Sequence, residues 1–161
     1  MTAAEAAKKF EVGGFKFTAP AGWEWVESAS PMRKAQLQVP SSDGKKSPEV
    51  VFFHFGKGGG GGAKANIERW FNQFQEPREK INARSELVTL GKHKVTYVTA
   101  DGTYKSGMPG GPQTPMTGYA LLGAIIESDE GDVFIRMTGP KELTEKSAAV
   151  FKKMVEDALK V

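Results

Sequence analysis

Two runs of strand-like segments, each followed by one amphipathic helix, constrain the fold of this chain more than any other feature. The segments are rich in β-branched and aromatic residues and are separated by short turns or by loops that carry Gly, Pro, Ser or Asp. Strands joined in this way pair antiparallel. The first run comprises residues 15–17, 23–25, 32–39 and 50–55, and the second comprises residues 87–90, 94–104, 119–127 and 133–138.

Both helices are predicted from apolar stripes with the spacing i, i+3, i+4 and i+7. The stripes consist of Ile67, Trp70, Phe71 and Phe74 in the first helix and of Phe151, Met154, Val155 and Ala158 in the second. Pro77 marks the end of the first helix. We therefore predict an α+β fold, a largely antiparallel central sheet of about 6–8 strands with helices packed on it.

The size of the chain fits one domain. A chain of 161 residues buries roughly 70% of the surface that its unfolded form exposes, which is enough for a core without disulfides. The chain contains no cysteine, which excludes disulfides, thiolate nucleophiles and cysteine-ligated metals. We expect a single domain over residues 1–161, in which residues 1–11 form a flexible lead.

The charge of the chain is only mildly positive, at +3, which is too little to predict nucleic-acid binding. The excess is concentrated in residues 31–64, where six bases face two acids. We interpret these bases as a solvated loop face, with contact to an anion or a membrane surface as the alternative. The six bases are Arg33, Lys34, Lys45, Lys46, Lys57 and Lys64.

Five consecutive glycines, residues 58–62, lie between the strand at 50–55 and the first helix. Together with Gly56 they match the pattern G-x-G-x-x-G, and helix N-termini bind anions. The match fails in context, because a dinucleotide site needs a parallel βαβ unit and an acid at the end of a second strand. We interpret the run as a flexible connector, leave a weaker anion or partner site open, and predict no cofactor.

A polar stripe on the first helix, formed by Asn66, Arg69 and Gln73, runs beside the apolar one. Its side chains either bond to neighbouring backbone or line a groove in which Arg69 binds a carboxylate or phosphate. Residues 107–118 form a loop, since seven of the twelve are Gly or Pro, and the loop is long enough to act as a flap. The candidate ligand or partner contacts are Lys57, Lys64, Asn66, Arg69, Gln73, Met108 and Met116.

The remaining polar residues form no recognisable catalytic or metal-binding pattern. His54 shares a strand face with apolar residues and is expected on the sheet, whereas His93 is expected to be exposed in a hairpin. Asp129, Glu130 and Asp132 surround a glycine without the spacing of a calcium loop, so an acidic hairpin turn is the better interpretation. We predict no metal site and no catalytic residues.

Three segments carry a resemblance to a known group of domains. The opening Phe15-x-Phe17-x-Ala-Pro20-x-Gly-Trp23 resembles the first strand and turn of PsbP-like and Mog-like domains, and the strands at 119–127 and 133–138 with the last helix resemble their closing hairpin and helix. Residues 65–74 look like a group of uncharacterised bacterial exported proteins and lipoproteins. The resemblance implies an antiparallel sheet between helices and a non-enzymatic role in binding or assembly. PsbP proteins serve photosystem assembly and Mog proteins bind a small GTPase, but no residue set here matches either binding site.

We therefore expect a non-catalytic binding or accessory domain with an unknown protein partner. The alternative is a small-molecule or anion-binding protein, or a small enzyme, with a cleft between the glycine run, the polar stripe and the 107–118 loop. The resemblance implies a periplasmic or otherwise exported protein, and a cytoplasmic one is the alternative. No segment is apolar enough to span a membrane, and the first residues lack a signal-peptide core, so any peripheral or lipid-anchored membrane association would need an N-terminal signal missing here.

Overall fold

A computed structural model gives the arrangement of most of the chain. It describes residues 9–20, 22–26, 33–39, 48–56, 62–107, 113–129 and 131–159. The strands within these ranges are β1 (Lys9–Val12), β2 (Phe15–Thr18), β3 (Glu24–Trp25), β4 (Arg33–Gln38), β5 (Glu49–His54), β6 (Arg84–Leu90), β7 (His93–Gly107), β8 (Gln113–Ile126) and β9 (Val133–Pro140). The helices are α1 (Gly62–Phe71), the 3₁₀ helix η1 (Arg78–Lys80), α2 (Lys141–Lys146) and α3 (Ala148–Leu159).

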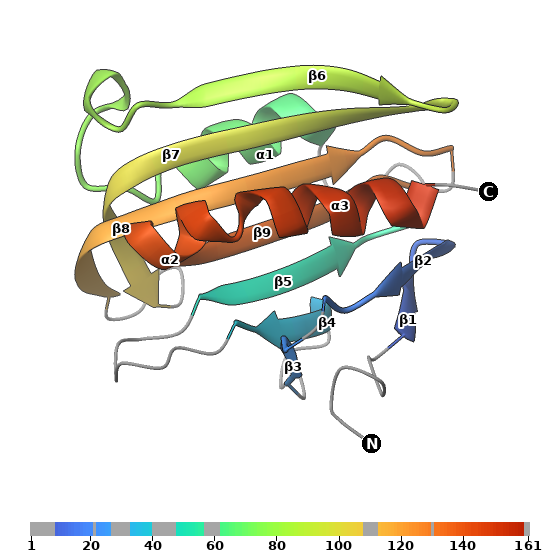
Figure 1. Cartoon of the computed structure of the whole chain (residues 1–161). Coiled ribbons are helices and arrows are strands. Elements are labelled where there is room, and N and C mark those ends of the chain that lie inside the picture. Colours follow the sequence, from blue (N-terminus) through green and yellow to red (C-terminus); the bar gives the residue numbers. More distant parts are fainter. Residues whose placement is uncertain are drawn as a thin grey trace.

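Seven of these strands form one antiparallel sheet in the order β3-β4-β5-β9-β8-β7-β6, shown in Figure 1. The last strand of the chain, β9, lies at the centre and joins the two runs of strands by pairing with β5 and β8. The strands β1 and β2 form a separate hairpin. The predicted α+β fold with a largely antiparallel sheet is confirmed.

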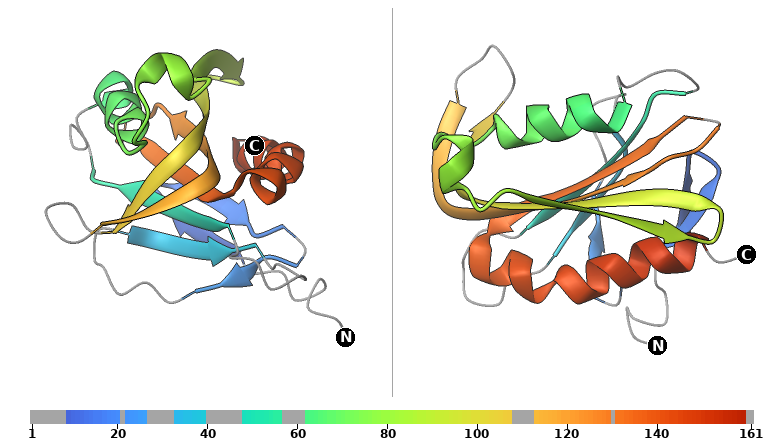
Figure 2. Two further views of the ribbon diagram at one scale, coloured as in Figure 1. Left: turned by 90° about the vertical axis from the view of Figure 1, so that its left-hand side faces the viewer. Right: turned by 90° about the horizontal axis from the view of Figure 1, so that it is seen from above.

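The helices cover both faces of the sheet, as the two views of Figure 2 show. On one face α2 and α3 pack together with the β1–β2 hairpin, and the core there includes Phe17, Phe52 and Phe151. On the other face α1 packs over β7 and β8 with a core that includes Trp70 and Leu121. Successive residues along the sheet strands point to opposite faces, so their apolar side chains contribute to two separate cores.

Trp70 of α1 sits directly on Gly123 of β8. A Cβ atom at position 123 would lie 2.5 Å from Cζ3 of Trp70, a distance that real Cβ contacts do not reach. The glycine has an ordinary backbone conformation, so its role is to make room for the indole rather than to turn the chain. This contact fixes how close α1 lies to the sheet.

The first helix is shorter than predicted. It ends at Phe71 rather than near Pro77, and Phe74 lies beyond it in an isolated bridge with Tyr104. The backbone leaves the helix because Gln73 O accepts a hydrogen bond from Lys105 N at 2.7 Å, while Gln75 N donates to Thr103 O at 2.8 Å. Pairing with β7 thus replaces the last helical turn.

The loop predicted over residues 107–118 is shorter than expected, because strands occupy both of its ends. The strand β7 continues to Gly107 and β8 begins at Gln113, and the two pair up to these residues. Pro115 is tolerated because β9 pairs with β8 only from Tyr119 onward, so among the described strands this part of β8 has a neighbour on one side alone. Residues 108–112 lie outside the described ranges.

Two short elements were not predicted. Lys9–Val12, placed largely in the expected flexible lead, forms β1 and pairs with β2, which buries Val12. Residues 1–8 lie outside the described ranges. The helix α2 follows Pro140 directly, which is its N-cap, with φ of −52° and ψ of 135°.

Candidate functional site

The two sides of α1 face different parts of the sheet. Phe71 faces the edge strand β6, because it lines a cavity together with Ala83 and Ser85. The opposite side carries Asn66 and leads to Gln73 just beyond the helix, which contacts the central strand β9. The side of α1 that carries the predicted polar stripe therefore borders the part of the sheet formed by β9 and β5.

Asn66 has a structural role within this stripe. Its side chain is buried and donates from Nδ2 to Gly62 O at 2.8 Å, which satisfies a carbonyl in the first turn of α1. Its Oδ1 accepts a hydrogen bond from Arg69 Nη1 at 3.3 Å. Asn66 thus orients Arg69, whose side chain is otherwise exposed.

Gln73 is the centre of a network that joins three elements. Its Oε1 accepts hydrogen bonds from the Tyr104 hydroxyl and from Arg136 Nη1, each at 3.1 Å. Tyr104 comes from β7 and Arg136 from β9, so one amide oxygen links the end of α1 to two strands. A carbonyl oxygen has two lone pairs, and both are used here.

Arg136 is the charged residue at the centre of the sheet. It lies on β9, opposite Val51 on β5 and Gly123 on β8, and is partly buried. Its guanidinium lies over the ring of Phe53, 5.7 Å from the ring centre, a favourable cation–π position. Among the described residues no carboxylate forms an ion pair with it.

Two aromatic pairs lie near Arg136, one through Phe53 and the other through the Tyr104 hydroxyl that shares Gln73 with it. The Phe53 ring stacks on that of Phe55 at 6.2 Å, and Phe55 keeps 39% of its surface exposed. Tyr104 stacks on Tyr119, also at 6.2 Å. Burial raises the pKa of Tyr119, and the nearby negative charge of Glu49 raises it further, so this phenol stays neutral. The area therefore combines aromatic rings with the Arg136 guanidinium and, beside Tyr119, the negative charge of Glu49.

The structure brings together some of the predicted site residues and separates others. Asn66 and Arg69 share one side of α1, Gln73 follows just beyond the helix, and Met116 pairs opposite Tyr104, which contacts Gln73. Lys64 lies two positions before Asn66, which is 200° away around the helix, so it does not belong to this surface. Lys57 and Met108 lie outside the described ranges, as does most of the glycine run.

Sequence reasoning missed Arg136 and Phe53, which are central to the surface. The available signal was the single charge in the apolar segment Val133–Met137, since a charge in the middle of a central strand needs a partner or a purpose. The pairing of β9 beside β5, which brings Phe53 under the guanidinium, could not be read from the sequence.

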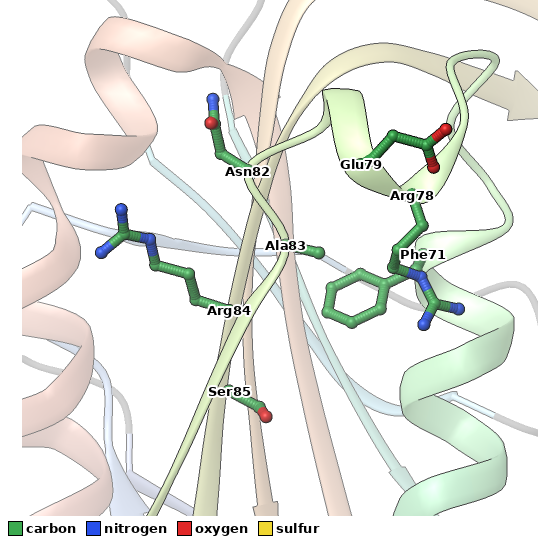
Figure 3. A pocket seen from close by; sticks show the side chains of 7 residues that line it. All are labelled: Phe71, Arg78, Glu79, Asn82, Ala83, Arg84 and Ser85. Atoms are coloured by element: carbon green, nitrogen blue, oxygen red, sulfur yellow. The ribbon is translucent and has the colours of Figure 1, made fainter.

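A cavity of about 530 Å³ lies on the other side of α1, against the edge strand, and Figure 3 shows it from close by. Its lining residues are Phe71, Arg78, Glu79, Asn82, Ala83, Arg84 and Ser85. Arg78 lies over the Phe71 ring at 4.9 Å and forms an ion pair with Glu68, so its charge is already matched. The side chain of Arg84 points away from Phe71.

A second cavity, of about 470 Å³, is lined by Glu11, Gly13, Gly14 and His54. His54 is only partly buried at the end of β5, and a Cβ atom at Gly13 would lie 2.8 Å from its ring. His93 is partly buried as well, since its ring packs edge-on against Phe15 at 5.0 Å, so the expectation that it is exposed is only partly right. No group of three or more His, Asp or Glu residues in the described ranges could hold a metal ion. None of the described helices has the length and apolarity needed to cross a bilayer.

Comparison with known proteins identifies the fold. No protein-family model matches the sequence, and no curated protein matches it. Among solved structures, the cyanobacterial PsbP protein of Synechocystis is similar over 92% of this chain and 88% of its own, at 12% identity and a TM-score of 0.54. At so low an identity, the structural similarity shows the fold alone, and that fold is PsbP-like.

Two further solved structures share the architecture. A protein of unknown function from Pseudomonas aeruginosa matches over 93% of this chain and 94% of its own, with 10% identity and a TM-score of 0.50. A protein from Bacteroides thetaiotaomicron matches over 93% of this chain at 16% identity and a TM-score of 0.51. This chain spans 47% of the Bacteroides protein.

Proposed function

We propose that this chain is a non-catalytic binding domain that holds an acidic segment of a protein partner on the sheet surface around Arg136. One observation carries the proposal. Arg136 lies on the central strand, partly exposed, with one hydrogen bond to Gln73 and no paired carboxylate among the described residues. The guanidinium is thus partly open to solvent and has one described hydrogen-bond acceptor for its five donors.

The chemistry of Arg136 suits a carboxylate. A guanidinium has five N–H donors in a fixed plane, and Gln73 accepts from one of them. The contacts with Gln73 and Phe53 fix the plane, which reduces the entropy lost when a ligand binds. A bidentate carboxylate can then use the remaining donors.

The surroundings favour a protein over a small molecule. Arginine and aromatic residues dominate the energetics of protein interfaces, and here Arg136 lies over Phe53, whose ring stacks on the exposed ring of Phe55. Arg69 adds a second positive charge on the adjacent side of α1. Small-molecule sites are concave pockets, and the two cavities described above are lined by other residues. The PsbP-like order of elements supports an accessory role.

The proposed binding can be tested by NMR with a hexaglutamate peptide. We expect the peptide to shift the backbone signals of residues around Arg136, Gln73 and Phe53, and we expect Arg136→Gln to remove the effect. Arg136→Lys keeps the charge but loses the planar fork, so it should bind about tenfold more weakly. Lys16→Gln, which removes one exposed charge from β2, is the matched control and should bind normally.

Two results would overturn the proposal. One is peptide binding that Arg136→Gln leaves unchanged, which would reduce the effect to general attraction by surface bases. The other is inorganic phosphate producing the same shifts at lower concentration than the peptide, which would favour the small-anion alternative.

We also propose that the chain acts outside the cytoplasm, in the periplasm or an equivalent compartment. The support is the resemblance of residues 65–74 to exported bacterial proteins and lipoproteins. Fractionation of cells that produce the protein from its own gene tests this, and recovery in the cytoplasmic fraction alone would contradict it.

A further inference from the structure

The edge strand β6 ends the sheet and has no described neighbour on its outer side. In Figure 1 it is the uppermost strand, and the view from above in Figure 2 shows it between α1 and α3 with neither helix across its outer edge. Its first four residues, Arg84 to Leu87, are all exposed. Leu87 has 60% of its surface exposed, the largest value among the large hydrophobic residues described.

The hairpin that follows β6 determines which backbone groups point outward. Leu90 pairs with His93 across the two-residue turn Gly91–Lys92, and such a closing pair is hydrogen-bonded to its own partner strand. The register then continues without a bulge to Arg84, so inward and outward residues alternate. The outward N–H and C=O groups therefore belong to Ser85, Leu87 and Thr89. These groups form a template for another strand.

We propose that this edge pairs with β6 of a second copy of the chain, antiparallel and centred on Ser85. In this register Arg84 of each copy lies opposite Glu86 of the other, which gives two pairs of opposite charge. Centring on Glu86 instead would place like charges opposite each other, and centring on Leu87 would place Arg84 opposite Leu90. Cross-strand charge pairs therefore favour the register centred on Ser85.

The side chains on the face of β6 that is turned toward α1 fit the same register. Side chains alternate along the strand, so Ala83, Ser85 and Leu87 lie on the α1 side and Arg84 and Glu86 on the α3 side. Leu87 of one copy then lies opposite Ala83 of the other, beside the cavity that Phe71 and Ser85 line.

The exposed Leu87 of each copy can thus occupy the recess of the other copy. The contact is self-complementary, as an interface with two-fold symmetry must be. Both copies keep α1 on the same side of the joined sheet, because directly opposite residues of an antiparallel pair share a face.

The interface is small, because only the five residues 83–87 of each copy face each other. Contacts of this size belong to the weak and transient class. The dimer is therefore expected to depend on concentration, and sedimentation velocity from about 10 µM to about 1 mM covers the relevant range.

Charge reversal tests both the dimer and its register. Arg84→Glu alone and Glu86→Arg alone each place like charges opposite each other twice, and each should weaken association by about tenfold or more. The double variant R84E/E86R restores two opposite pairs and should recover wild-type association. Circular dichroism and thermal melting of each monomer show that the fold is kept.

Three outcomes decide the matter. If both single variants lose self-association and the double variant recovers it, the register centred on Ser85 is supported. A wild-type chain that stays monomeric up to about 1 mM overturns the proposal. Single variants that associate like the wild type also overturn it, because the copies would then meet elsewhere.

Discussion

Gln73 Oε1 accepts a hydrogen bond from Arg136 Nη1 at 3.1 Å, although the two residues are 63 positions apart in the chain. The same oxygen accepts from the Tyr104 hydroxyl. The amide thereby connects the end of α1 to the central strand of the sheet and holds the guanidinium beside Phe53. We therefore expect both stability and the proposed binding to depend on this side chain.

Replacing Gln73 by Ala should destabilise the protein. The change leaves the Tyr104 hydroxyl and one Arg136 donor without their acceptor, and an unsatisfied, partly buried polar group costs about 1–3 kcal/mol. Urea unfolding measures the difference. Gln75→Ala removes an exposed side chain two positions on and should change the free energy of unfolding by less than about 0.5 kcal/mol. Equal effects of the two variants would contradict the role of the network.

Replacing Gln73 by Glu should separate folding from binding. A carboxylate at position 73 would accept from the same donors and would add an ion pair with Arg136. We expect the variant to melt at or above the wild-type temperature and to lose binding of the hexaglutamate peptide, because the guanidinium is then already paired. A variant that still binds the peptide at wild-type strength would show that Arg136 is not the anchor.

The arrangement of this surface shows what the sequence could and could not predict. The parts of the apolar and polar stripes that lie within α1 could be predicted, because helical periodicity alone determines which residues share a side, whereas Gln73 and Phe74 lie beyond the helix. The partner of Gln73 was not readable, because it depends on β9 entering the sheet between β5 and β8. Pairing between strands far apart in the chain leaves no local pattern.

The errors at element ends have a similar origin. Gly and Pro in residues 107–118 predicted a loop, but backbone pairing between β7 and β8 overrides local preference where only one neighbour is present. The first helix was predicted to reach Pro77, but backbone bonds to Thr103 and Lys105 replace its last turn. In both cases long-range hydrogen bonds prevail over local propensity.

Replacing Gly123 by Ala should destabilise the packing of α1. The added methyl group would lie 2.5 Å from Cζ3 of Trp70, so the indole or the helix must move. Overpacking of this kind costs about 1–3 kcal/mol, which urea unfolding can measure. The cost of Gly123→Ala should be smaller in a Trp70→Phe background, since phenylalanine has a smaller ring. An equal cost in both backgrounds would show that the strain has another source.

The acid stability of the protein should depend on Glu76. Hydrogen bonds from the Thr103 N–H and hydroxyl, each at 2.8 Å, hold the pKa of this carboxyl below its usual value. A lowered pKa in the folded state contributes stability above the unfolded pKa, and this contribution is lost as pH falls through the folded pKa. The relevant window lies below about pH 5.

Two variants test this pH dependence by thermal melting from about pH 6 to about pH 3. Thr103→Val removes the hydrogen bond from the Thr103 hydroxyl to Glu76. The melting temperature of this variant should therefore fall less steeply as the pH is lowered. Thr103→Ser keeps the hydroxyl, so its melting temperature should change with pH as that of the wild type does. If valine and serine give the same slope, the Thr103 hydroxyl does not control the titration of Glu76.

Two buried tyrosines should respond oppositely to loss of their hydroxyl groups. The Tyr97 hydroxyl is buried and has no hydrogen-bond partner within the described part of the chain, whereas that of Tyr104 donates to Gln73. Tyr97→Phe removes an unsatisfied group and should leave the free energy of unfolding unchanged or higher, while Tyr104→Phe should lower it by about 1 kcal/mol. Urea unfolding at neutral pH compares the pair directly.

The alkaline behaviour of Tyr97 gives an independent check of the same environment. Burial, and then the negative charges of Glu156 and Glu86, raise the pKa of Tyr97 to about 12. In the unfolded chain this tyrosine ionises at about pH 10, so the folded state loses stability as pH rises from about 10 to about 12. Tyr97→Phe should reduce that loss, and unfolding measured at several alkaline pH values would show it. An unchanged alkaline profile would mean that the Tyr97 hydroxyl reaches water and ionises as it does in the unfolded chain.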